Sequence, residues 1–191
     1  MHRSWRGIVY IATSLDGFIA RADGSIDFLD LDPAVTHAAS VPGNGLQASY
    51  DALMSKVDVV LMGRGTYEKV LTFDSWPFTH PVIVLSTGLP DDQDDRIEVV
   101  RSLPDAVERL EALAAGAVYI DGGRVIQAFL EAGLVDEITL TRVPVIIGAG
   151  IPLFGAVSSD IELSLESVET EGGYLMARYS VVRQHIEGGP L

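Results

Sequence analysis

Three turns in this sequence combine the residue types that bind phosphate groups. Each follows an apolar run typical of a buried strand, and they consist of Gly63, Arg64 and Thr66, then Ser86 and Thr87, then Gly122, Gly123 and Arg124. Glycines let the backbone approach a ligand, and arginine and hydroxyl side chains donate hydrogen bonds to phosphate oxygens. Each turn alone is also consistent with a plain connection, and none has the G-x-G-x-x-G spacing of the Rossmann fingerprint. Together they predict an anion-binding site.

Carboxylates that could move a proton or hold a substrate occur in two segments. Asp16 and Asp27 lie in a polar stretch over residues 14–45, whereas Asp51 lies in a helical pattern over residues 46–57. A carboxyl group placed beside a reacting centre can act as a general acid or base. The alternatives are that Asp16 caps the turn it forms with Gly17, and that Asp51 is an ordinary solvated helix residue.

The elements that must position these groups alternate along the chain. Apolar runs over residues 5–12, 57–62, 81–85, 97–100, 117–120 and 135–143 predict buried strands, and helical patterns over 46–57, 66–71, 102–113 and 124–132 separate several of them. Two alternating runs, 161–168 and 174–182, predict a C-terminal antiparallel hairpin. We therefore expect an α/β fold with a mostly parallel sheet and helices on both faces. Residues 1–185 are expected to form one domain, with 186–191 as a loose tail.

Composition narrows the class of function. The 191 residues carry 13 basic and 27 acidic side chains, which gives a formal net charge of −14, and there is no cysteine. Such a negative field disfavours nucleic acid and anionic membranes as partners. The absence of thiols excludes disulfides and cysteine-ligated metals, and we expect no metal site. We predict no signal peptide and no membrane-spanning segment, and a cytoplasmic location.

Several motifs, taken as a set, resemble a known family. They are the stretches 14–20, 61–68, 120–124, 129–137, 144–150 and 153–154, whose order and spacing cover about residues 7–155. The chain resembles the dihydrofolate reductase superfamily, in particular the C-terminal reductase domain of bacterial bifunctional riboflavin-biosynthesis deaminase-reductases. The resemblance implies a dihydrofolate reductase-like fold with an eight-stranded, mostly parallel sheet and a C-terminal antiparallel hairpin. It also implies NADPH as cofactor.

Carried over to this sequence, the resemblance assigns cofactor-binding roles to the three turns. It implies that Gly63, Arg64 and Thr66 meet the cofactor phosphates, that Ser86 and Thr87 lie near the adenosine 2′-phosphate, and that Gly122, Gly123 and Arg124 face the pyrophosphate. Ala12 would lie beside the nicotinamide, and Gly17 belongs to the loop that would close over it. We expect residues 14–30 to act as this closing loop.

The substrate side departs from the pattern of the folate-reducing members. Those members have a carboxylate 16 residues before the glycine that is Gly63 here, and this position is Gln47. The candidates for catalysis are therefore Asp16, Gln47 and Asp51, with Asp27 as a substrate ligand. Two aromatic side chains, Tyr67 and Phe154, could pack on a flat substrate or belong to the core.

These observations predict an NADPH-dependent reductase that acts on a small pterin- or aminopyrimidine-like acceptor. The alternative is a nucleotide- or pterin-binding module of the same fold without turnover. The chain has no cysteine, so it lacks the C-x-x-C signature of a zinc deaminase, and its four histidines are scattered; it is at most a free-standing reductase. The resemblance also implies a homodimer. The uncharged apolar stretch 144–153 is a candidate for its interface, although burial within one subunit would also explain it.

Overall fold

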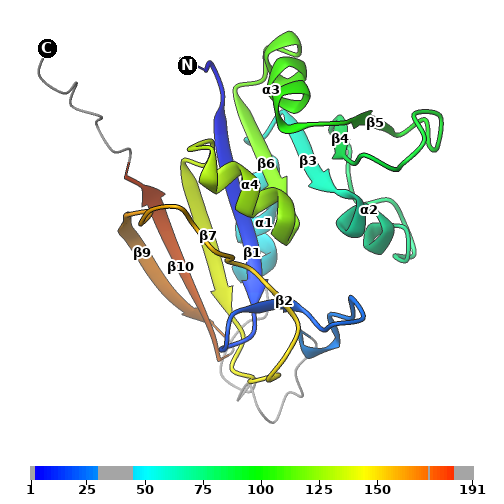
Figure 1. The fold of residues 1–191 in the computed structure, drawn as a ribbon. Coiled ribbons are helices and arrows are strands. Elements are labelled where there is room, and N and C mark those ends of the chain that lie inside the picture. Colours follow the sequence, from blue (N-terminus) through cyan, green and yellow to red (C-terminus); the bar gives the residue numbers. More distant parts are fainter. Residues whose placement is uncertain (1–2, 30–44, 172, 183–191) are drawn as a thin grey trace, which may run out of the picture.

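The computed structural model describes residues 3–29, 45–171 and 173–182 of the chain (Figure 1). Its elements are β1 (Arg6–Thr13), β2 (Phe18–Ala20), the 3-10 helix η1 (Asp27–Leu29), α1 (Gly45–Met54), β3 (Val59–Gly63), α2 (Arg64–Val70), β4 (Val82–Leu85), β5 (Ile97–Val100), α3 (Leu103–Ala112), β6 (Ala117–Asp121), α4 (Gly123–Glu131), β7 (Glu137–Arg142), β8 (Ile151–Pro152), β9 (Leu163–Glu171) and β10 (Tyr174–Val181). The tail predicted at residues 186–191 lies outside the described residues.

The eight-stranded sheet has the order β5-β4-β3-β6-β1-β7-β10-β9. Its pairs from β5 to β7 are parallel, and β10 pairs antiparallel with both β7 and β9. The predicted fold class is therefore confirmed. A second, two-stranded ribbon of β2 and β8 was not predicted, because its strands are too short to show a period in the sequence.

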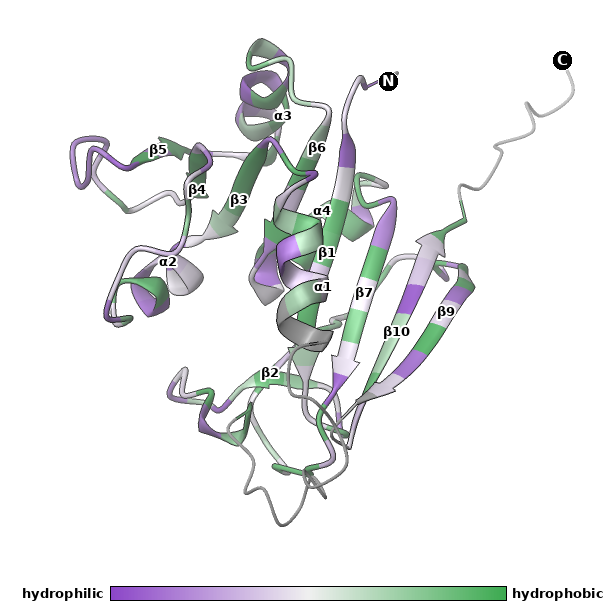
Figure 2. Ribbon diagram, turned by 180° about the vertical axis from the view of Figure 1, so that it is seen from behind, coloured by the Kyte–Doolittle hydropathy of each residue, from purple (hydrophilic) through white to green (hydrophobic). Residues whose placement is uncertain are grey.

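Two hydrophobic cores cover the two faces of the sheet. On one face, α3 and α4 pack side chains such as Leu110 and Phe129 against alternate residues of the central strands. On the other face, α1 and α2 cover a second core that contains Tyr67 and Met62. β3 is apolar along its length and β6 is largely so up to Asp121, whereas β9 alternates between hydrophilic and hydrophobic residues (Figure 2). Central strands buried on both faces read as continuous apolar runs, so the sequence identified them readily.

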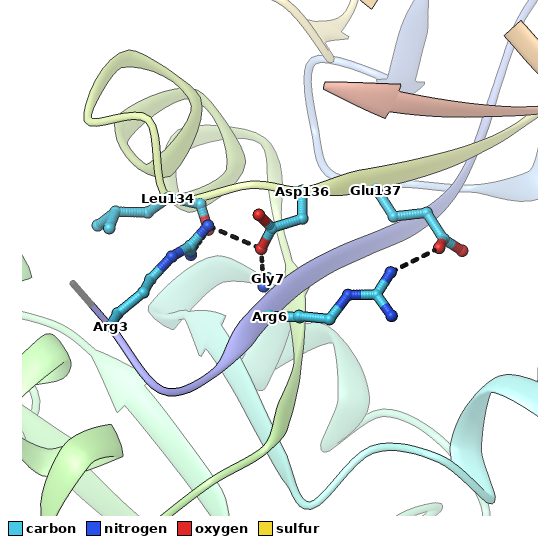
Figure 3. Close-up of polar contacts among 6 residues, drawn as sticks. All are labelled: Arg3, Arg6, Gly7, Leu134, Asp136 and Glu137. Atoms are coloured by element: carbon cyan, nitrogen blue, oxygen red, sulfur yellow. Dashed lines mark hydrogen bonds and ion pairs between the residues drawn. The ribbon is translucent and has the colours of Figure 1, made fainter. Parts of the chain in front are cut away.

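The two ends of the sheet have different roles. The parallel strands β1, β3, β4 and β6 end at Thr13, Gly63, Leu85 and Asp121, so the predicted turns come together at one edge (Figure 1). Open parallel sheets bind ligands at this carboxyl edge. The opposite edge holds a cluster of polar contacts. There the Asp136 carboxylate accepts hydrogen bonds from the Arg3 guanidinium (2.7 Å) and the Gly7 N–H (2.8 Å) (Figure 3).

Candidate active site

The first and third predicted turns are in direct contact. Gly122 has a backbone φ of +92°, and a Cβ at this position would lie 2.4 Å from the hydroxyl oxygen of Thr66. Only glycine allows both the conformation and this approach. Gly63 ends β3 immediately before α2 and would place a Cβ 3.1 Å from Val125. The glycines thus bring the ends of β3 and β6 together, as a compact base for a ligand site.

Arg64 lies beside the second turn. Its NH1 is 3.6 Å from the position that a Cβ of Gly88 would occupy, and its Nε donates to the Glu68 carboxylate at 2.6 Å. Thr87 is exposed, whereas Ser86 is buried and its hydroxyl accepts the N–H groups of Gly88 and Leu89. Ser86 therefore shapes the turn, while Arg64 and Thr87 present their donors to solvent.

Sequence reasoning missed Arg101, which follows β5. Its NH1 donates to the carbonyl oxygens of Ser86 (2.8 Å) and Leu89 (2.5 Å), and its NH2 pairs with Asp91. Arg101 thus braces the second turn from the side of β5. An arginine directly after a predicted strand was the available signal.

Both glycines of the third turn are buried. A Cβ at Gly123 would lie 3.0 Å from Ile19 and 3.2 Å from the carbonyl oxygen of Pro152. The β2–β8 ribbon therefore covers the start of α4, and this packing requires glycine at position 123. Arg124 remains exposed at the same helix end.

The predicted closing loop is joined to a second loop. The Leu15 N–H donates to the carbonyl of Val145 at 2.7 Å, and the Leu153 N–H donates to the carbonyl of Gly17 at 3.0 Å. Asp16 accepts the N–H groups of Ile147 (3.2 Å) and Gly148 (2.8 Å). The two segments form one unit at the end of β1, so any closure of residues 14–29 must involve the loop before β8.

Two predicted acids have structural roles in this unit. A hydrogen bond with Ser14, together with those from Gly148 and Ile147, lowers the pKa of Asp16. Hydrogen bonds from Arg21 (2.6 Å) and Ser25 lower the pKa of Asp27 in the same way. Both carboxylates are acceptors that shape their own loops, and the roles in proton transfer and substrate binding expected for them stay predictions.

An acid that the sequence analysis left unassigned, Asp121, is the group best placed for proton transfer. It ends β6, is half-buried, and burial raises its pKa to about 6, although a hydrogen bond from the Gly122 N–H (2.7 Å) opposes the shift. A carboxyl group that titrates near neutrality at a ligand-binding edge is a functional candidate. The signal in the sequence was an acidic residue at the end of an otherwise apolar strand.

Three tyrosines surround the approach to Asp121. The Tyr50 ring lies edge-on to those of Tyr10 (5.9 Å between centroids) and Tyr119 (6.3 Å), and the Tyr119 hydroxyl donates to the carbonyl of Tyr10. Burial, with a contribution from Asp121, raises the pKa of Tyr50 to about 12. Alternation along β1 places Ala12 on the same face of the sheet as Tyr10. Asp121 thus ends β6 beside a cluster of packed tyrosine rings between α1 and the sheet.

The remaining predicted substrate residues are placed differently. In α1, Asp51 is exposed, and the side chain of Gln47 lies outside the described part of the structure. Tyr67 is only 1% exposed and its hydroxyl donates to Asp94 at 3.0 Å, which favours the alternative that it is a core residue. Phe154 is 47% exposed, beyond β8.

The described residues contain neither a cluster of metal ligands nor a membrane-spanning helix. Within residues 3–29, 45–171 and 173–182, no group of three or more His, Asp or Glu side chains could hold a metal ion. In the same part of the chain, none of the helices has the length and apolar character needed to cross a membrane.

One protein family and several individual proteins are similar to nearly the whole chain. The family model of the RibD C-terminal domain matches residues 6–176. YwjB, an uncharacterized protein of Bacillus subtilis (strain 168), is 34% identical over 177 residues, which span 90% of this chain and 95% of the relative. The crystal structure of a putative riboflavin biosynthesis protein from Shewanella sp. PV-4 is 38% identical with a TM-score of 0.80, and the match covers 93% of this chain and 99% of that one.

A more distant structure shares the fold. It is a diaminohydroxyphosphoribosylaminopyrimidine deaminase/5-amino-6-(5-phosphoribosylamino)uracil reductase from Thermotoga maritima, 16% identical with a TM-score of 0.68. The match covers 94% of this chain but 57% of the longer protein. At this identity the likeness concerns the arrangement of the elements alone.

Proposed function

The chain belongs to the RibD C-terminal domain family, and on that basis we propose that it is an NADPH-dependent reductase of a small pterin- or aminopyrimidine-like acceptor. The observation that carries the proposal is the placement of Asp121. It stands at the same end of the sheet as the Arg64 and Thr87 turns, with a cluster of tyrosine rings beside it. The proposed cofactor and acceptor subsites therefore lie side by side, at the carboxyl ends of neighbouring strands.

The residues at this edge fit a dinucleotide with an extra phosphate. Arg64, Thr87 and the Gly88 backbone would hold the 2′-phosphate, because the guanidinium lies against a turn that has no side chain at Gly88. Exposed Arg124 is a second cation for the pyrophosphate. When bound, NADPH supplies the hydride, and the backbone of Ala12 borders the place of the reacting ring.

The chain's own part in the reaction is to hold the acceptor and deliver a proton. Tyr10 and Tyr50 offer ring edges and faces against which a flat acceptor can pack. Reduction of a C=N or C=O bond places the hydride on carbon and requires one proton on the heteroatom. Asp121 donates that proton from its protonated form and is reprotonated from solvent, and its half-buried position limits competing water.

The first test separates a reductase from a binding module. Quenching of tryptophan fluorescence on addition of NADPH measures binding, and loss of nicotinamide absorbance with pterin or aminopyrimidine acceptors measures turnover. Binding with turnover supports the reductase, whereas binding without turnover of any such acceptor supports the non-catalytic module.

Arg64→Ala is expected to remove the preference for NADPH over NADH. Loss of one charge-assisted contact to a phosphate weakens binding by roughly ten- to a hundredfold. NADH lacks that phosphate, so its dissociation constant should stay within about twofold. Titration of both cofactors into both proteins checks this, and an unchanged affinity ratio would remove Arg64 from the 2′-phosphate site.

We further propose that the functional unit is a homodimer that buries one face of the C-terminal hairpin. On this face Leu163, Leu165 and Val168 of β9 are 40–56% exposed, and Leu175 of β10 adjoins them. The opposite face of the hairpin carries Glu169 of the edge strand β9, and charged side chains on an edge strand disfavour edge pairing of two copies. A flat apolar sheet face packs well on its own copy through a two-fold axis. In the stretch 144–153, which is the interface expected from the sequence, Ile146 is exposed but Leu153 is buried.

Light scattering is expected to give a mass near twice 20.5 kDa for the native protein. Leu165→Glu should return the monomer mass, because a charge cannot be buried in an apolar interface without a partner. Since Leu165 is 56% exposed in the monomer, the variant should keep its fold. A native mass near 20 kDa at micromolar concentration would contradict the dimer.

A further inference from the structure

Glu68 lies beside Arg64, and the proposed function gives it no role of its own. The two residues are one turn apart on α2, and the Glu68 carboxylate accepts from Arg64 Nε at 2.6 Å. Their side chains are 50% and 55% exposed. An exposed pair of this kind contributes little to stability, so its geometry points to something other than folding.

The hydrogen bond determines which nitrogens of Arg64 stay available. Glu68 occupies Nε, and NH1 lies against the turn at Gly88. An arginine recognises phosphate best through two parallel N–H donors at one edge of its planar group. With Nε held by Glu68, NH1 lies beside the second turn and is placed to meet a ligand there. A free arginine side chain would instead sample many rotamers before it met a ligand.

The opposite wall of this subsite is also held in place. Arg101 binds the carbonyl oxygens of Ser86 and Leu89, which brackets Thr87 and Gly88 between two fixed points. Both sides of the subsite are therefore prepared before a ligand arrives. Preorganisation of this kind raises affinity by reducing the entropy lost on binding.

We propose that Glu68 is a positioning residue that orients the Arg64 guanidinium for the 2′-phosphate of the cofactor and thereby contributes to cofactor selection. The inference rests on the proposed function, since it needs a nucleotide at this edge. It also requires that the benefit of orientation exceeds the repulsion between the carboxylate and the phosphate. Solvent screens that repulsion at a half-exposed site, whereas the hydrogen bond acts at 2.6 Å.

Two substitutions at Glu68 separate orientation from charge. Glu68→Gln keeps an oxygen that accepts from Arg64 Nε and removes the negative charge, whereas Glu68→Ala removes both. Dissociation constants for NADPH, NADH and 2′,5′-ADP are measured by calorimetry. We expect Glu68→Ala to weaken NADPH and 2′,5′-ADP by roughly three- to tenfold with NADH unchanged, and Glu68→Gln to restore binding to within about twofold.

Glu108 provides the matched control. It is an exposed glutamate on α3, so Glu108→Ala and Glu108→Gln change the net charge equally without touching Arg64. These variants should bind like the native protein. Tighter NADPH binding in both Glu68 variants would mean that Glu68 competes with the phosphate, and unchanged binding in both would mean that it is a bystander. Either result overturns the proposal, whereas a native protein that binds no NADPH overturns the proposed function with it.

Discussion

Asp121→Asn is expected to lower the rate of acceptor reduction by roughly 10²- to 10⁴-fold, the usual contribution of a positioned general acid. The amide has nearly the shape of the carboxyl group and can still accept from the Gly122 N–H, but it has no proton to give at the pH of the reaction. The dissociation constant for NADPH should stay within about twofold, because the substitution keeps the shape of the side chain and leaves the proposed phosphate ligands Arg64, Thr87 and Arg124 in place. Single-turnover kinetics with NADPH and acceptor measure the chemical step directly.

The pH dependence of the rate distinguishes whether Asp121 acts as a general acid or as a general base. Burial raises the pKa of Asp121 to about 6, and the protonated carboxyl is the active form of an acid. The rate should therefore be constant below about pH 6 and fall about tenfold for each pH unit above it. A base in the same position would give the opposite slope. A profile that keeps its shape in Asp121→Asn would contradict the assignment.

The stability of Asp121→Asn provides a control, because we expect this variant to lose activity without losing stability. Because the pKa of Asp121 is raised in the folded state, the folded protein binds this proton more tightly than the unfolded chain, and folding loses stability as pH rises from about 4 to about 6. Asparagine does not ionise, so Asp121→Asn should keep or raise the melting temperature at pH 8. A loss of activity together with lower stability would indicate damage to the fold instead of loss of a proton donor.

Asp136→Ala is expected to destabilise the protein by about 3 kcal/mol or more, without changing cofactor affinity. Asp136 and its partner Arg3 are 14% and 7% exposed at their side chains, and Asp136 also accepts from the Gly7 N–H (Figure 3). Removal of the carboxylate leaves a nearly buried guanidinium and a backbone donor without this acceptor. For a chain of this length the melting temperature should fall by roughly 6–12 °C.

The neighbouring ion pair supplies the comparison. Arg6 and Glu137, the first residues of β1 and β7, are 3.2 Å apart, but their side chains are 63% and 27% exposed (Figure 3). Glu137→Ala should therefore cost no more than about 1 kcal/mol. Urea unfolding of both variants measures the difference, and equal losses of stability would show that burial is not what makes the Asp136 contact strong.

The positions of the central strands along the chain were predictable from the sequence, because the signals that mark them are local. Runs such as 57–62 and 117–120 are apolar without alternation, which only a strand buried on both faces requires. Glycines and small polar residues after these runs marked the ligand-binding edge, since parallel strands end on the same side. Arg64 could be selected for the same reason: it directly follows a strand that had to lie in the sheet.

The chemistry of individual acids depended on contacts that no local pattern contains. Asp16 and Asp121 each adjoin a glycine in the sequence, yet Asp16 accepts two N–H groups from residues more than 130 positions away, whereas burial among tyrosines of β1, α1 and β6 raises the pKa of Asp121. Likewise, alternation in residues 161–168 predicted a strand but not that its apolar face would lie beyond the cover of α4. Spacing specifies which face a side chain occupies, and only the packing of distant segments decides whether that face meets water, a hydrogen-bond donor or a hydrophobic wall.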